Sequence, residues 1–393
     1  MTNPSYVRLQ ITVFTLVSAA FTNIYITQPV LPVLQHEFSA DMVVVSLTVS
    51  AVILGIACSN LPFGFLADRL PIHRIILLGG VCVAACGLMC ALAHNLWTLI
   101  AVRFLQGLFI PALTTCLAAY LSKTLPIDRL NVVMGSYVSA TVIGGLGGRL
   151  LGGWLHPPLH WRYAFLLAAA MVLVAAFNAF RQLPRAPAGD AHARAPQGYL
   201  SLLACAGLLR IYCCAAGSFG IFSSIFNYLP FRLNDPPFNY STELTTLLYG
   251  VYVIGIFMGP LAGKFSNRFG SGNTLLGGTL VMGTSLVFFL APSLSAVIGG
   301  LLCACAGFFT VHAAAVGSLN RKLASGQGRA NALYMLFFYV GGWGGITCTG
   351  FAFKHGGWNA VLLTCAGFLL VPLYASLAER KPHGSNRVLK NCA

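Results

Sequence analysis

Apolar runs of about 20 residues without a charged side chain recur along the whole chain, and they constrain its fold more than any other feature. Each run is long enough to cross the hydrocarbon core of a bilayer as a helix. Only 8% of the 393 residues are charged, whereas a soluble surface needs roughly a quarter. The short alternating segments of a transmembrane barrel are absent from the sequence. The pattern therefore predicts an all-α membrane protein and excludes a soluble one.

We expect twelve transmembrane helices in two six-helix halves. Residues 181–200 are rich in Pro and Arg, which is the composition of a linker. We therefore divide the chain into an N-terminal half (1–180), a cytoplasmic linker (181–207), a C-terminal half (208–378) and a cytoplasmic tail (379–393). The expected spans are 11–34, 43–66, 75–94, 97–121, 131–154, 162–180, 208–231, 242–263, 274–292, 295–318, 329–353 and 358–377.

The distribution of positive charge along the chain indicates how the spans are oriented in the membrane. The net charge is +15, and most of the 23 Lys and Arg fall on alternate loops and at the two termini. By the positive-inside rule those loops and both termini are cytoplasmic. We expect contact with lipid headgroups and no nucleic acid. The exceptions are Arg103, Arg149, Arg162, Arg232 and Lys354.

A short basic turn between two apolar runs occurs once in each half. Its first copy lies within Leu61–Arg74, and its second within Leu261–Gly270, where Gly64 aligns with Gly263 and Arg69 with Arg268. The tryptophan before span six, Trp161, likewise corresponds to Trp358 before span twelve. Such a parallel internal repeat is typical of secondary transporters, whose substrate site lies between the halves near the bilayer midplane.

Three motifs of this chain resemble the signatures of one known family. Gly64–Arg69, GFLADR, resembles the loop 2–3 signature, although Pro71 and Ile72 depart from it. Arg103–Gly107, RFLQG, resembles the R-x-x-Q-G signature of span four. Gly144–Gly153 resembles the glycine-rich span-five signature of antiporters, with Gly145 at the usual proline position. Together they resemble signatures of the major facilitator superfamily, and in particular its drug:proton antiporter branch, which implies a proton-coupled exporter. We expect a monomer, because one chain contains both halves.

The resemblance implies a cytoplasmic gate built from Gly64, Asp68, Arg69 and Arg74. In the family the aspartate docks at the start of span eleven, here near Arg329, and this contact holds the cytoplasmic side shut. A carboxylate in that position gains from the dipole of the neighbouring helix. The alternative is a plain stop signal with charges at a helix end.

Four ionisable groups are candidates for proton coupling or for a charged site: Arg103, Arg149, His312 and Asp41. Ionisable groups at membrane depth are costly and are functional candidates by default. Arg103 could instead snorkel to the outer interface, and Arg149 could anchor glycine-packed helices. His312 titrates near physiological pH when unperturbed, or could be a neutral histidine bonded to a neighbour.

No Asp or Glu falls in the middle of any expected span. In the family that the chain resembles, many cation exporters rely on a buried carboxylate. A bulky cation is therefore less favoured as the substrate than a neutral or anionic solute. Polar and aromatic side chains on the spans are candidate substrate contacts, although they also join helices to each other. These candidates are Asn23, Tyr25, Gln28, Gln106, Asn227, Tyr228, Tyr249, Tyr252, Tyr339 and Trp343.

The sequence predicts a secondary transporter in a bacterial inner membrane that exports a small organic solute or drug by proton antiport. Uptake by symport or facilitated diffusion of a metabolite is the alternative. A membrane-embedded enzyme with His312 as base is a distant third, as is a non-transporting sensor. We expect no cofactor and no metal, because no nucleotide-binding motif, CxxC pair or Cys/His cluster is present.

Overall fold

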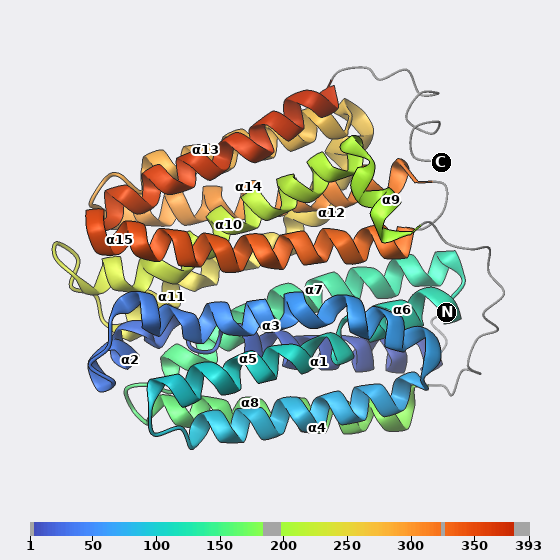
Figure 1. Ribbon diagram of the computed structural model, residues 1–393, viewed down its shortest axis with the longest axis horizontal. Helices are drawn as coiled ribbons and strands as arrows, with labels where there is room; N and C mark the ends of the chain where they lie inside the picture. The colour runs from blue at the N-terminus through green and yellow to red at the C-terminus, as the bar shows by residue number, and fades with distance from the viewer. Residues whose placement is uncertain (1–3, 184–197, 324–326, 381–393) are drawn as a thin grey trace. The chain divides into compact units, whose positions relative to one another are not determined.

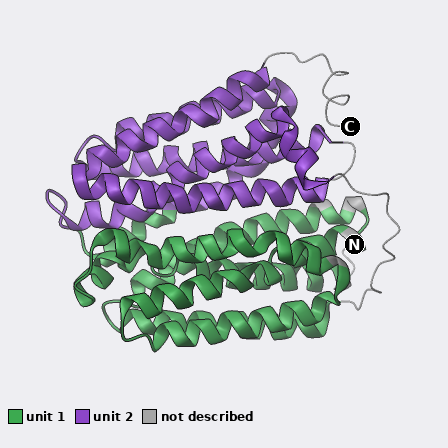
Figure 2. Ribbon diagram, viewed as in Figure 1, with its two compact units in different colours: residues 1–192, 240–250 green, residues 193–239, 251–393 purple. Residues whose placement is uncertain are grey.

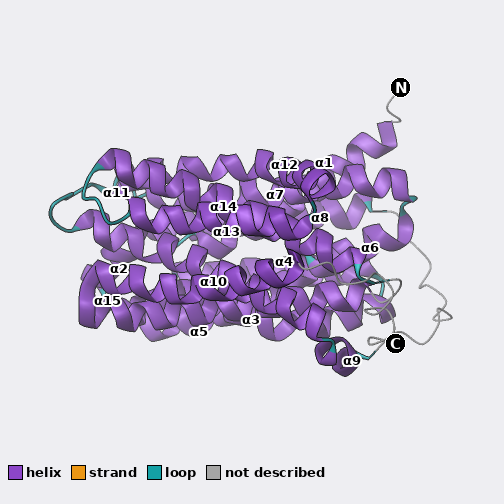
Figure 3. Ribbon diagram, turned by 90° about the horizontal axis from the view of Figure 1, so that it is seen from above, coloured by secondary structure: helices purple, strands orange, loops and turns teal. Residues whose placement is uncertain are grey.

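The computed structural model describes residues 4–183, 198–323 and 327–380, with the side chains of Asp68 and a few other residues outside this description. Every regular element in these ranges is a helix (Figures 1 and 3). The described residues form two compact units, coloured separately in Figure 2. Unit 1 comprises 1–192 and 240–250, and unit 2 comprises 193–239 and 251–393.

The helices of unit 1 differ widely in length. They are α1 (Pro4–Tyr25), η1 (Gln28–Val30), α2 (Leu31–Glu37), α3 (Met42–Arg69), α4 (Ile72–Ala91), α5 (Leu96–Leu113), α6 (Thr115–Thr124), α7 (Ile127–Trp154), α8 (Trp161–Gln182) and α11 (Thr242–Leu248). The 3-10 helix η2 (Tyr249–Val253) links unit 1 to unit 2. Unit 2 contains α9 (Tyr199–Ala204), α10 (Ala206–Asn234), α12 (Ile254–Phe269), α13 (Ser271–Phe288), α14 (Leu294–Arg321) and α15 (Gln327–Arg380).

These helices account for the twelve expected spans. In the described ranges nine helical stretches are long and apolar enough to cross a membrane. The helices α7 and α13 supply two more, and their glycine, serine and threonine residues make them less apolar. One of the nine stretches, α15, contains two helices joined at Gly357 and therefore supplies two spans, which brings the number to twelve. The predicted all-α, twelve-span membrane fold is confirmed.

Spans one, four and eight differ from the prediction because each is interrupted. Span one breaks between Tyr25 and Gln28, ahead of Pro29 and Pro32. Span four breaks at Thr114, three residues after Pro111. A proline cannot donate the i→i−4 hydrogen bond, and its ring crowds the preceding turn. Span eight divides into α11, η2 and α12 without a proline at the break.

Glycines of α7 bring it into direct contact with the backbone of α1. A Cβ on Gly144, Gly148 or Gly152 would collide with the carbonyl oxygens of Ser18, Thr22 and Ile26, respectively. These positions recur every four residues, so one face of each helix forms the contact. In unit 2 the same kind of contact joins α10 and α15, where Gly345 lies against Gly220. Close backbone approach through small residues is the common way to pack helices in lipid.

We predict that Gly148→Ala destabilises the protein, whereas Gly135→Ala on the same helix does not. The Gly148 Cβ would lie 3.0 Å from the carbonyl carbon of Thr22. This is a backbone atom, so it cannot move aside by a rotamer change as a side-chain atom could. The expected cost is about 1–3 kcal/mol. No described atom lies within 4 Å of a Cβ at Gly135. The only effect of alanine at this position is therefore a better helix propensity. Thermal unfolding of both variants in detergent measures the difference. Equal melting temperatures would contradict the close contact.

Candidate functional site

The break in span one lies at the centre of a buried polar cluster in unit 1. Asn23, Thr27 and Gln28 are each at most 1% exposed, although they surround the interruption of a helix. The last carbonyl groups of α1 have no complete set of helical partners, because the helix ends at Tyr25. Interrupted spans are where secondary transporters commonly bind substrates or ions. We call Asn23, Gln28, Arg103, Gln106 and Arg149 the arginine cluster.

Arg103 caps the broken end of α1. Its guanidinium donates from Nη1 to the Asn23 carbonyl at 2.6 Å and from Nη2 to the Ile24 carbonyl. Its Nε donates to the Thr48 carbonyl of α3 at 2.9 Å. The side chain is 0% exposed, so the snorkelling alternative does not hold. One planar fork from α5 thus ties the end of α1 to α3.

Gln106 completes the hydrogen bonds around Arg103. Its Oε1 accepts from Arg103 Nη1, and its Nε2 donates to Asn23 Oδ1 at 3.1 Å and to the Val83 carbonyl of α4 at 3.2 Å. Asn23 in turn donates from Nδ2 to the Ala19 carbonyl at 2.8 Å. The R-x-x-Q spacing places both side chains on one face of α5, one turn apart. The described acceptors of Arg103 are all neutral oxygens.

Arg149 lies against the other side of the break, on α7. It donates from Nε to Gln28 Oε1 at 2.7 Å and from Nη1 to the Gly145 carbonyl at 2.8 Å. Its guanidinium carbon is 4.1 Å from the ring centre of Tyr25 and 5.5 Å from that of Tyr249. Cation–π contacts of this kind stabilise a buried guanidinium. Five of the predicted substrate contacts therefore surround the two buried arginines: Asn23, Tyr25, Gln28, Gln106 and Tyr249.

Unit 2 contains a different kind of cluster, which is aromatic. Its core members are Phe219, Phe222 and Phe226 of α10, Phe308 and Phe309 of α14, and Phe338 of α15, and we call these six the aromatic cluster. Phe219 stacks on Phe338 with ring centres 3.8 Å apart, and Phe222 stacks on Phe308 at 4.1 Å. Tyr252 and Tyr339, both predicted substrate contacts, meet the cluster edge-on.

His312 lies at the edge of the aromatic cluster and is bonded to a tyrosine. Its Nδ1 is 2.9 Å from the Tyr334 hydroxyl, which comes from α15. Its ring stacks near Phe308 and tilts against Phe338. The sequence analysis allowed for a bonded histidine, and the partner is this hydroxyl. A histidine and a tyrosine at hydrogen-bond distance can pass a proton between them.

The other predicted substrate contacts have more local roles. The Tyr228 hydroxyl donates to the Ile346 carbonyl at 2.9 Å and so joins α10 to α15. Asn227 is fully buried on α10, and Trp343 is partly exposed on α15. Asp41 accepts from the Val43 amide at 2.8 Å and is the N-cap of α3. These contacts are those of helix ends and helix packing.

The predicted gate residues lie at the junction of α3 and α4. Arg69 is the last residue of α3, is exposed, and places its guanidinium carbon 4.1 Å from the ring centre of Phe65. Arg74 is exposed in the first turn of α4. A Cβ at Gly64 would meet no described atom within 4 Å. The side chain of Asp68 lies outside the described part of the chain, so its expected docking stays a prediction.

A family model for the Major Facilitator Superfamily matches residues 13–343. The chain belongs to the major facilitator superfamily. The transporter named "Uncharacterized MFS-type transporter YybF", from Bacillus subtilis, is 26% identical over 370 residues, covering 91% of this chain and 89% of the relative. The "Inner membrane transport protein YnfM" of Escherichia coli is 27% identical over 382 residues, covering 94% and 90%.

Solved structures agree in fold. The bacterial homologue of the human lysosomal transporter Spinster, in its inward-facing and occupied conformation, superposes with a TM-score of 0.77 at 15% identity, covering 100% of this chain and 99% of that one. The family match and the two curated relatives identify this major facilitator as a membrane transporter. The predicted superfamily is confirmed, whereas the narrower drug:proton antiporter branch stays a prediction.

Sequence reasoning missed three features of this major facilitator. The aromatic cluster had a readable signal, because Phe219, Phe222 and Phe226 follow helical i, i+3, i+7 spacing. The partner of His312 had none, since Tyr334 comes from another helix. The third feature is the role of Glu37. Its carboxylate accepts from Arg162 Nη1 at 2.6 Å and from the Trp161 indole, so it joins the end of α2 to the start of α8.

Proposed function

We propose that the protein exports a small neutral or anionic organic solute in exchange for protons by alternating access. The observation that carries the proposal is the pair of buried guanidinium groups, Arg103 and Arg149, on either side of the break in span one. No Asp or Glu occurs in the middle of any span to attract a cation. A positive, water-poor site favours an anionic or strongly polar oxygen of the solute.

Within this proposal the two arginines differ in role. Arg103 is bound mainly by backbone carbonyls, so it holds the broken helix in shape. Arg149 donates to the Gly145 carbonyl and to the Gln28 side chain and is flanked by the rings of Tyr25 and Tyr249, and these three side chains can change rotamer. We assign solute recognition to Arg149 and its neighbours.

We assign proton coupling to the pair His312 and Tyr334. The two side chains are hydrogen-bonded within unit 2, and the imidazole of His312 can accept one proton. Asp41 is the secondary candidate, although its carboxylate already caps α3. Asp68 and Arg69 act as the cytoplasmic gate. The proposed halves are 1–180 and 208–378, joined by the linker. The protein works as a monomer in a bacterial inner membrane with both termini cytoplasmic.

Transport by purified protein in liposomes that contain a pH-sensitive dye tests coupling and direction. A proton gradient is imposed, and panels of cationic, neutral and anionic solutes are added. We expect protons and an anionic or neutral solute to move in opposite directions. Co-directional movement would replace antiport by uptake through symport, and solute movement without protons would indicate a facilitator.

The variants Asp68→Asn, His312→Ala and Tyr334→Phe locate the coupling. We expect His312→Ala to abolish solute-dependent proton movement while leaving downhill solute exchange measurable. Tyr334→Phe retains the ring and removes the hydroxyl, so it should slow proton movement by about tenfold or more. Unchanged rate and coupling in both Asp68→Asn and His312→Ala would refute the assigned roles.

A further inference from the structure

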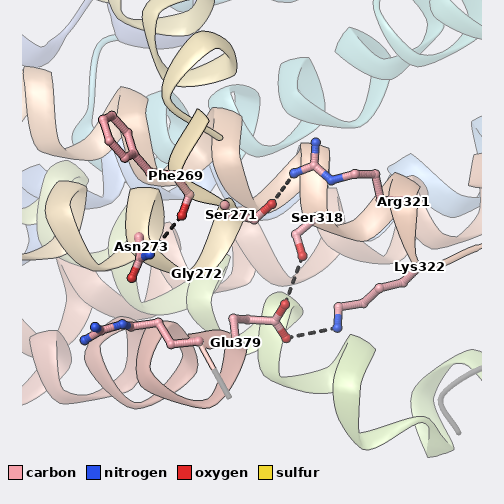
Figure 4. Close-up of a pocket in the computed structure, with 10 residues that line it drawn as sticks. Phe269, Ser271, Gly272, Asn273, Ser318, Arg321, Lys322 and Glu379 are labelled. Atoms are coloured by element: carbon pink, nitrogen blue, oxygen red, sulfur yellow. Dashed lines mark hydrogen bonds and ion pairs between the residues drawn. The ribbon is translucent and has the colours of Figure 1, made fainter. Parts of the chain in front are cut away.

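A cavity of about 300 Å³ in unit 2 is lined by none of the residues of the aromatic cluster (Figure 4). It is formed where the α12–α13 junction meets the ends of α14 and α15. Its lining residues are Phe269, Gly270, Ser271, Gly272, Asn273, Ser318, Arg321, Lys322, Glu379 and Arg380. The proposed orientation places this cavity at the cytoplasmic leaflet. The arginine cluster and His312 do not line it.

The cavity carries an excess of positive charge. Glu379 is the only acidic residue among its lining residues. Lys322 Nζ is 3.2 Å from Glu379 Oε1, and the Ser318 hydroxyl donates to Glu379 Oε2 at 3.0 Å. The Glu379 side chain is 7% exposed, so Lys322 and Ser318 already satisfy a buried carboxylate. In the described ranges no carboxylate forms an ion pair with Arg321 or Arg380.

The start of α13 adds further positive potential to the same cavity. Gly270, the N-cap residue, has no side chain to accept from the first amides of the helix, and the first turn contains no acidic residue. The Arg321 guanidinium nevertheless donates to the Ser271 hydroxyl in this turn (Figure 4). A guanidinium beside the positive end of a helix is electrostatically unfavourable. An anion bound between the Arg321 guanidinium and the start of α13 would be attracted to both and would offset their repulsion.

The glycines at this junction keep the backbone open to the cavity. Gly270 has a φ of 85°, which favours glycine. A Cβ on Gly272 would lie 2.7 Å from the backbone nitrogen of Arg380, so the first turn of α13 packs directly on the end of α15. Arg321, Arg380 and the first turn of α13 thus line the same cavity.

We propose that this cavity binds a phosphate group through Arg321, Arg380 and the first turn of α13. Phosphate fits because its oxygens accept from arginine in a bidentate manner and from helix-start amides. The group could be supplied by an anionic lipid headgroup, which basic pockets between membrane helices bind at the cytoplasmic side, or by a soluble phosphate. The inference does not depend on the transported solute or on proton coupling.

Binding to delipidated, full-length protein in neutral detergent tests the proposal. Phosphatidylglycerol, cardiolipin, phosphatidylcholine and inorganic phosphate are titrated at physiological salt, with native mass spectrometry and thermal shift as readouts. The variant is Arg321→Gln/Arg380→Gln. The charge-matched control is Lys264→Gln/Arg268→Gln, which removes two exposed cations of α12 that do not line the cavity.

We expect the cavity variant to bind its phosphate ligand at least about tenfold more weakly than the wild type, and the control variant to bind as the wild type does. Binding of anionic lipid without inorganic phosphate identifies the lipid as the source, and the reverse identifies soluble phosphate. Equal loss in both double variants would mean diffuse surface attraction and would overturn the site. So would wild-type affinity in the cavity variant. Ligand-free melting temperatures check that both variants are folded.

Discussion

The Arg103→Lys variant is expected to melt at a lower temperature than the wild type and to transport at least about tenfold more slowly. Lysine keeps the positive charge but has no planar fork, so it cannot reach the Asn23, Ile24 and Thr48 carbonyls together. Each buried carbonyl left without a donor costs about 1–3 kcal/mol. The free energy of unfolding should therefore fall by roughly 2–5 kcal/mol.

The control for Arg103→Lys is Arg162→Lys. Arg162 also binds through its guanidinium, but its partner Glu37 is 29% exposed and the pair can be solvated. We expect a loss of at most about 1 kcal/mol there. Thermal unfolding in detergent and initial transport rates in liposomes provide the two readouts. Wild-type stability in Arg103→Lys would show that charge alone matters and that the capping of α1 is dispensable.

Replacing Arg149 should change the choice of solute more than the stability of the fold. Arg149→Gln removes the charge facing Gln28, Tyr25 and Tyr249. The loss of one charge-assisted hydrogen bond to an anion corresponds to about 10–100-fold in apparent affinity. We expect KM for anionic solutes to rise by that factor, while KM for neutral solutes changes by less than about threefold.

Arg149→Lys separates charge from geometry at this position. Lysine retains the cation, so binding of anionic solutes should recover in part. At Arg103, by contrast, lysine is expected to lose both stability and transport. Transport of the same solute panel by Arg149→Gln, Arg149→Lys and the wild type gives the comparison. If Arg149→Gln retained the wild-type KM for every anion, solute recognition would lie elsewhere. Arg149 would then be an anchor between α7 and the break in span one.

The apolar runs were sufficient to predict the fold, because spanning a bilayer permits few alternatives to a helix. Prolines could also have located two of the three interruptions, since Pro29 and Pro111 lie beside the breaks in spans one and four. The break in span eight has no such mark. It depends on how α11 and η2 pack, which a single sequence does not display.

The candidate site was predicted residue by residue but not as an arrangement. Charge at membrane depth identified Arg103 and Arg149, since a buried guanidinium always needs partners. Several of their partners are backbone carbonyl oxygens, such as those of Asn23, Ile24 and Gly145, and backbone acceptors leave no trace in residue identity. Likewise, nothing in the spacing of His312 and Tyr334 indicates that two neighbouring helices bring them within 2.9 Å.

The turn at Gly357 fixes the phase of the last helix. Its φ of 63° and ψ of −159° belong to a region that is essentially restricted to glycine, and α15 has no loop around it. Trp358, Val361, Leu362 and Cys365 are buried at i, i+3, i+4 and i+7 directly after the turn. One added residue would rotate everything beyond it by about 100° and move this buried face away from its neighbours. Chain length at this connection is therefore specified to the single residue.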